Sequence, residues 1–149
     1  MQRYAVEKER PDHHDADLVI KLYDLRREPI MRESRAAINS QYWPKTLDDA
    51  LAVTKSDHPL NAPFRQTSTY WEMVYGMARH GVTHADFLVE NNGEGLFLFA
   101  RVLPFLAPFR EAVGPRAFRN AEWISTECES GRLALEHFRA RVAKALASR

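Results

Sequence analysis

The sequence predicts an all-α protein, an irregular bundle of about six or seven helices around one central apolar helix. The central helix is predicted by the longest apolar run of the chain, Gly95–Phe109, in which Arg101 is the only charged residue. The segments before and after this run repeat their apolar residues at helical spacing, and no segment outside the central region makes a good strand. A run with so many phenylalanines and leucines must be covered by the rest of the chain.

The chain begins with a polar segment, residues 1–14, for which we expect a loose arm, because chain ends are rarely ordered unless they dock. Residues 15–149 are expected to form a single helical domain, since this length suffices for one sizeable core. Asp15 or Asp17 is expected to cap the first helix. Its apolar face is predicted from three leucines at helical spacing, Leu18, Leu22 and Leu25.

Prolines divide the next part of the chain. Pro29 either kinks the first helix or begins a second one, and Pro44 ends that unit. A short helix is expected to start near Thr46, because Thr46-Leu47-Asp48-Asp49 resembles a helix-starting box. The residues from Lys55 to Pro63 contain prolines and an asparagine and predict the longest loop.

Amphipathic helices are predicted on both sides of the central run. The strongest begins near Thr67 and is expected to stop at Gly81, and another starts at Thr83. After the run, Gly114-Pro115 predicts a break, and a helix is expected over residues 116–129. The last helix has a single apolar stripe, formed by Leu135, Phe138, Val142 and Leu146.

Residues 86–100 allow a second interpretation, an α+β fold with one small β-hairpin. Asn92-Gly93 between two apolar stretches is the strongest short turn signal. We favour helix, because the apolar run continues past any strand end and a lone hairpin is marginally stable in water. The same Asn-Gly pair also suits the end of a helix.

Arg101 is the first candidate site residue, because it lies in the middle of the apolar run. A buried guanidinium is costly unless a carboxylate or carbonyl groups satisfy it. We expect a structural ion pair with Glu72, Asp86 or Glu90 from another segment. The alternative is an anion-binding site where Pro104 kinks the helix.

Common catalytic and metal motifs are absent from the sequence. It has no glycine-rich phosphate loop, no nucleophile elbow and no Glu-x-x-His pair for a di-iron site. The best pair of metal ligands is His80 and His84, but Gly81 separates them and zinc needs three or four ligands. The single Cys128 excludes an internal disulfide. No metal or other cofactor is therefore expected.

The charge of the chain is balanced, with 21 basic and 20 acidic residues, so no strong signal for nucleic acid is present. Residues 132–149 hold five basic residues against one acid, which we interpret as a solvated helix face. The N-terminus has no apolar core of a signal peptide, and the apolar run is shorter than the about 20 residues of a membrane span. We therefore expect a cytoplasmic protein without a transmembrane segment.

Two short blocks of the sequence carry a resemblance. Leu22–Arg35, L-Y-D-L-R-R-E-P-I-M-R-E-S-R, and Ser68–Val74, S-T-Y-W-E-M-V, are similar to uncharacterised bacterial helical proteins classed as a domain of unknown function. Some members of that group carry an N-terminal membrane segment, which is not predicted here. The resemblance implies an all-helical cytosolic domain and transfers no catalytic residue.

These observations favour a non-catalytic helical interaction or regulatory module that self-associates, with a dimer favoured. Its large apolar residues, including Trp43, Trp71 and Trp123, are the reason. One alternative is a small-molecule or metal-dependent enzyme that uses a site near Arg101, with Glu72, His80 and His84 as further ligand-binding candidates. Another is a binder of nucleic acid or anionic membrane through the basic C-terminal helix. The sequence names no small-molecule ligand.

Overall fold

The computed structural model describes residues 8–149, and this part of the chain contains helices and no strand. The all-α prediction is confirmed. The hairpin alternative is wrong, because residues 86–100 lie in two helices and the short turn between them. The elements in chain order are α1 (His13–Arg26), α2 (Pro29–Gln41), α3 (Leu47–Ala52), α4 (Asn61–Arg79), α5 (Ala85–Asn91), α6 (Gly95–Val102), the 3-10 helix η1 (Leu103–Phe105), α7 (Leu106–Val113), α8 (Arg119–Glu127) and α9 (Glu129–Ala147).

The described residues form nine α-helices, more than the six or seven expected, because prolines and sharp turns divide the predicted elements. Pro29 begins α2 rather than kinking α1. Pro104 divides the central run, as expected, into α6, η1 and α7. Within residues 8–149, every helix is too short or too polar to cross a lipid bilayer.

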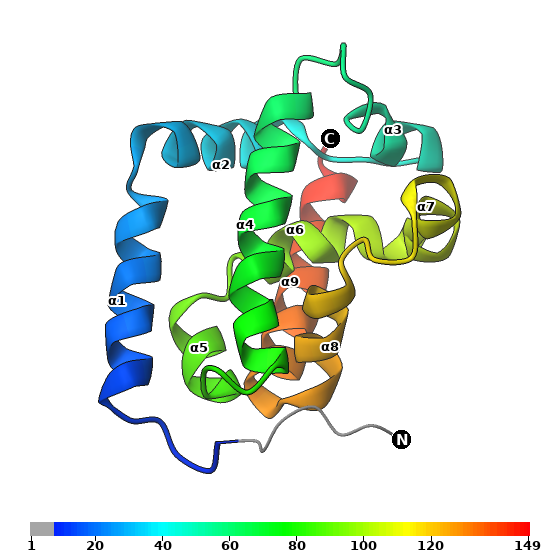
Figure 1. The fold of residues 1–149 in the computed structure, drawn as a ribbon. Coiled ribbons are helices and arrows are strands. Elements are labelled where there is room, and N and C mark those ends of the chain that lie inside the picture. Colours follow the sequence, from blue (N-terminus) through cyan, green and yellow to red (C-terminus); the bar gives the residue numbers. More distant parts are fainter. Residues whose placement is uncertain (1–7) are drawn as a thin grey trace.

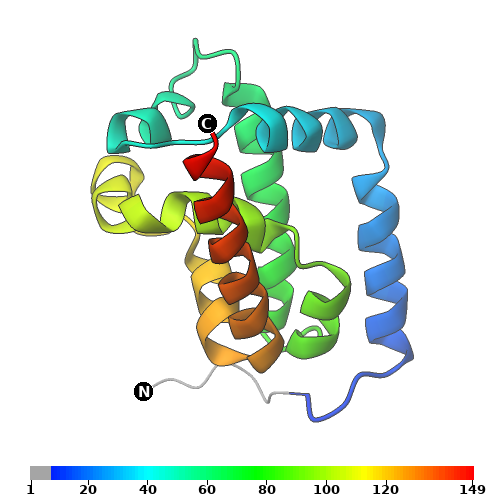
Figure 2. The ribbon, with the colours of Figure 1, turned by 180° about the vertical axis from the view of Figure 1, so that it is seen from behind.

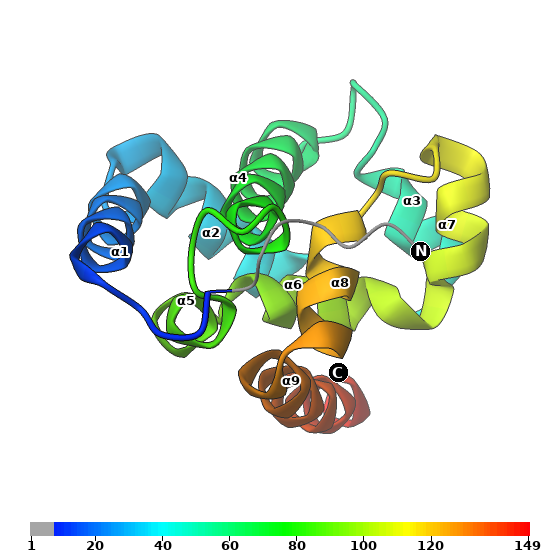
Figure 3. The same ribbon diagram turned by 60° about the horizontal axis from the view of Figure 1, so that its bottom comes forward.

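Helix α6 is the centre of the bundle. All of its residues from Gly95 to Val102 are buried. It lies between α4 on one side and α9 on the other, as the views from the front, from behind and from below show (Figures 1, 2 and 3). A Cβ atom at Gly95 would lie 2.7 Å from the rings of Trp71 and Tyr75 in α4. The glycine therefore allows the start of α6 to approach α4 closely.

Helix α1 stands at the edge of the bundle (Figure 1). Of its three predicted leucines only Leu22 is buried, and Ile20 and Tyr23 are exposed. The helix is capped by Asp12, three residues before the first expected cap. Residues 13 and 14 of the expected arm are thus helical, and residues 1–7 lie outside the described part of the chain.

Candidate functional site

Arg101 is buried, as expected, but its predicted partner is wrong. Its guanidinium donates from Nη1 to the carbonyl oxygens of Ile38 and Tyr42, both at 2.9 Å. These residues lie at the C-terminal end of α2, where the carbonyl groups carry partial negative charge. The Ile38 oxygen also accepts the backbone N–H of Tyr42 at 3.0 Å. The helix end therefore takes the place of a carboxylate. Burial lowers the pKa of Arg101 to about 10, so the side chain remains a cation at neutral pH.

A carboxylate reaches Arg101 only through an intermediate side chain. Arg101 Nη2 donates to Asn39 Oδ1 at 2.8 Å, and Asn39 Nδ2 donates to Glu94 Oε1 at 3.4 Å. Glu94 also pairs with Arg35, whose Nε lies 2.6 Å from Oε2. The sequence analysis missed Asn39 and Glu94, because these residues lie 55 positions apart and nothing local relates them.

Glu72, the second predicted site residue, also binds a helix end. Its Oε2 and Oε1 accept the backbone N–H groups of Asn120 and Ala121, each at 2.9 Å, in the first turn of α8. The cap position of α8 is occupied by Phe118, which has no polar side chain of its own. Burial raises the pKa of Glu72, although the two N–H donors act in the opposite direction.

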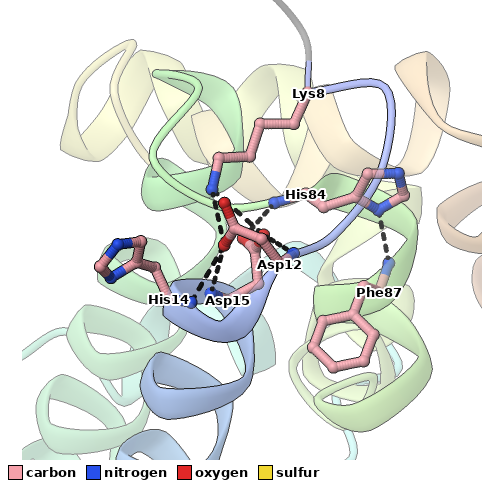
Figure 4. Close-up of polar contacts among 6 residues, drawn as sticks. All are labelled: Lys8, Asp12, His14, Asp15, His84 and Phe87. Carbon is pink, nitrogen blue, oxygen red and sulfur yellow. Dashed lines mark hydrogen bonds and ion pairs between the residues drawn. The ribbon is translucent and has the colours of Figure 1, made fainter.

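His80 and His84 do not form a metal pair. His80 is the C-terminal cap residue of α4, and His84 caps α5, where its Nδ1 accepts the backbone N–H of Phe87 at 3.1 Å (Figure 4). The helix ends at Arg79, before both of them, and Gly81, predicted from the sequence as a stop, follows the cap residue His80 with φ 75°. No group of three His, Cys, Asp or Glu side chains suited to a metal occurs within residues 8–149.

Asp15 joins the N-terminal segment to the loop before α5 (Figure 4). Its fully buried carboxylate accepts the backbone N–H groups of Asp12 at 2.8 Å and His84 at 2.9 Å, and the Lys8 ammonium lies 3.1 Å away. Burial alone would raise the pKa of Asp15, but the two N–H donors and Lys8 outweigh it and lower the pKa. The sequence analysis identified Asp15 as a possible cap and missed its contact with His84.

We expect Asp15→Asn to destabilise the chain by about 1.5–3 kcal/mol, because the amide lacks the charge and one of the two acceptor oxygens that the buried donors require. Since the pKa of Asp15 is lowered, its stabilising effect is present at neutral pH and is lost as the pH falls below about 4. Urea denaturation across pH measures this difference. Asp17→Asn, the same change at an exposed site of α1, is the control. An equal effect of both variants would contradict the assignment.

A groove lies near Arg101, between the end of α2, the turn before α6, and α9. It has a volume of about 750 Å³. We call it the aromatic groove. Its residues include the rings of Trp43, Phe97 and Phe138, the carboxylates of Glu90 and Glu94, and the basic side chains of His137 and Arg141.

Guanidinium groups alternate with the rings in this region. Arg101 lies 4.6 Å from the centre of the Phe97 ring and 5.0 Å from that of Trp43. Arg141 lies 4.5 Å from the same Phe97 ring, and Arg149 lies 4.4 Å from Trp43. Each ring thus contacts one buried and one exposed arginine, a favourable cation–π arrangement.

The two exposed arginines have no acidic partner in the described part of the chain. Within residues 8–149, neither Arg141 nor Arg149 forms an ion pair with a side-chain carboxylate. The basic residues after position 131 were interpreted from the sequence as a solvated face, and Arg141 and Arg149 are indeed exposed. Their contacts with the Phe97 and Trp43 rings were not predicted.

A family model described as a domain of unknown function, DUF4760, matches residues 11–128. This confirms the resemblance found in the sequence. No curated protein and no solved structure matches the chain significantly. The matched residues include α1 to α8 and the whole arrangement around Arg101, whereas α9, with Arg141, lies beyond them.

Proposed function

We infer that the chain, which belongs to the DUF4760 family of domains of unknown function, is a non-catalytic binding module that holds an acidic, partly apolar peptide segment of a partner protein in the aromatic groove. One observation carries this proposal. Arg141 and Arg149 are exposed, are held against aromatic rings, and have no carboxylate partner within the described residues.

The charges favour an acidic occupant where Arg141 lines the groove; Arg149 is outside this lining but contacts its Trp43 ring. Arg141 and Arg149 both act on the buried Arg101 as like charges and lower its pKa, after the larger effect of burial. A carboxylate bound near either exposed guanidinium group would offset this repulsion. Arginine binds carboxylates in a two-bond geometry, which gives specificity as well as affinity.

The walls of the groove favour a peptide over nucleic acid. Leu133 and Phe138 of α9 and Val89 of α5 line it, which suits apolar side chains of a peptide. Glu90 and Glu94 line the same groove and would repel a continuous phosphate backbone, whereas a peptide can carry its acidic residues only where it meets Arg141. The rings already contact guanidinium groups, so they offer less surface on which bases could stack.

The alternative of an enzyme at the predicted site residues has less support. Arg101, Glu72 and His84 each form hydrogen bonds to a helix end, in three different parts of the bundle. The self-association expected from the sequence stays a prediction, which light scattering on the purified chain would decide. The exposed Ile20 and Ile30 offer apolar surface for such a contact.

The test is a selection of peptides from a phage-displayed random library on the immobilised chain, followed by fluorescence anisotropy with the enriched peptides. We expect these peptides to combine acidic residues with large apolar ones. Arg141→Glu should weaken their binding by about tenfold or more, because it places a negative charge opposite the peptide carboxylate.

Arg139→Glu is the matched control. It makes the same charge change on the same helix, but Arg139 lines a different depression, beside Ser125 and Arg132. We expect this variant to bind the peptides like the unmodified chain. Failure of any peptide to enrich, or equal losses in both variants, would contradict the proposal. If the chain bound an oligo-dT strand tightly and Arg141→Glu abolished that binding, nucleic acid rather than a peptide would be the ligand of the groove.

A further inference from the structure

A second cavity, of about 450 Å³, lies between α4, α7 and the loop that leads into α8. Its apolar lining includes Phe64, Phe109 and Phe118, and the Phe118 ring contacts the other two. The centre of the Phe118 ring lies 6.3 Å from that of Phe64 and 5.9 Å from that of Phe109. The lining also includes the polar or charged residues Thr54, Ser68, Thr69, Glu72 and Arg116. Aromatic walls with polar groups that can orient a ligand are typical of a small-molecule site.

The backbone at the cavity is strained. Phe118 has φ 57° and ψ 22°, and it is the one non-glycine residue with positive φ among residues 8–149. A bulky side chain rarely adopts this left-handed conformation. Here the ring is buried and the following turn of α8 is held by Glu72, so the conformation persists. Such strain concentrates at binding and active sites.

Glu72 supplies the charge of the cavity. Each of its oxygens accepts one backbone N–H of α8, which leaves further lone pairs on both. No cationic side chain of the described part of the chain forms an ion pair with this carboxylate. Burial raises its pKa, against the smaller opposite effects of the two N–H donors and of the Arg110 and Arg79 charges. A positively charged group in the cavity would compensate for the burial.

We propose that this pocket, the Glu72 pocket, binds a small primary amine with an aromatic body, which places its ring among the three phenylalanines and its ammonium at Glu72. Ser68 and Thr69 of α4 lie at the same cavity and offer hydroxyl groups. Arg116, an exposed residue, also lines the pocket and could bind a carboxylate. An experiment must therefore distinguish an aromatic amine from an aromatic carboxylate as the ligand.

The test uses three probes of nearly equal shape, 2-phenylethylamine, 2-phenylethanol and phenylacetate, in a thermal-shift assay with the intact chain. At a concentration about tenfold above its dissociation constant, the amine should raise the melting temperature by about 3–6 °C. The neutral alcohol should shift it less, and the carboxylate should leave it unchanged. A larger shift with phenylacetate would overturn the proposal, as would no shift with the amine.

Variants locate the effect. Ser68→Leu should remove the response to the amine, because the larger side chain fills the cavity while Glu72 stays bound to α8. Gln66→Leu makes a similar change at an exposed position of α4 outside the cavity lining and should preserve the response. An unchanged response in Ser68→Leu would overturn the assignment to this pocket. These experiments do not involve the aromatic groove, so their outcome is independent of the proposed function.

Discussion

Replacing Arg101 with alanine is expected to destabilise the chain by about 3–5 kcal/mol, a large part of the about 5–15 kcal/mol that stabilises a typical domain. The variant leaves the carbonyl oxygen of Tyr42 and the side-chain oxygen of Asn39 without these donors, and the carbonyl oxygen of Ile38 with the Tyr42 N–H alone. It also opens a cavity beneath two aromatic rings, at a position where the native side chain is only 2% exposed. Both losses act in the same direction.

Two further substitutions separate these contributions. Arg101→Met keeps most of the side-chain volume and removes the donors, so we expect a smaller loss, of about 2 kcal/mol. Arg101→Lys keeps the charge but lacks the planar fork that reaches both carbonyls and Asn39, and it should fall between the native chain and Met. Urea denaturation followed by circular dichroism gives the three values. A loss below about 1 kcal/mol in Arg101→Ala would show that α2 does not depend on this cap.

Replacing Gly131 with alanine is the second substitution with a large expected effect. A Cβ atom there would lie 1.9 Å from the carbonyl oxygen of Ile124 and 3.1 Å from the sulfur of Cys128. Gly131 lies in the first turn of α9, where its N–H donates to Cys128 Sγ at 3.3 Å. The clash is with backbone, so no change of rotamer relieves it, and α8 and α9 must move apart. We expect a loss of about 3 kcal/mol or more.

Gly93→Ala is the matched control, because the same added methyl group would meet its nearest neighbour, the Val89 carbonyl oxygen, at 3.3 Å. A small shift relieves that contact, and we expect a change within about 1 kcal/mol. Thermal denaturation of both variants, followed by tryptophan fluorescence, makes the comparison. If Gly131→Ala and Gly93→Ala both had the melting temperature of the native chain, the close packing of α8 on α9 would be contradicted.

The parts of the fold that depend on local signals could be predicted from the sequence. The apolar spacing around Trp71 predicted α4, and Pro104 predicted the division of the central run. The burial of Arg101 followed from its apolar neighbours. The first helix was harder, because its exposed Ile20 and Tyr23 blur the apolar face on which the prediction relied.

The contacts of the candidate residues could not be predicted in the same way. Arg101 binds residues about 60 positions away, and Glu72 binds α8 at a separation of 48 positions. Only the packing of the helices decides which helix end lies opposite which polar side chain. The aromatic groove has the same origin, since Arg141 meets Phe97 through the contact of α6 with α9.

The capping of α2 and α8 by residues of other helices has a consequence for how the chain folds. Helix α8 spans nine residues, too few to be stable alone in water, and the side chain that binds its first turn belongs to α4. The end of α2 likewise obtains its donors from α6. Neither helix can therefore complete its hydrogen bonding before the bundle assembles. Amide protons in both should exchange through the opening of the whole domain rather than through local fraying.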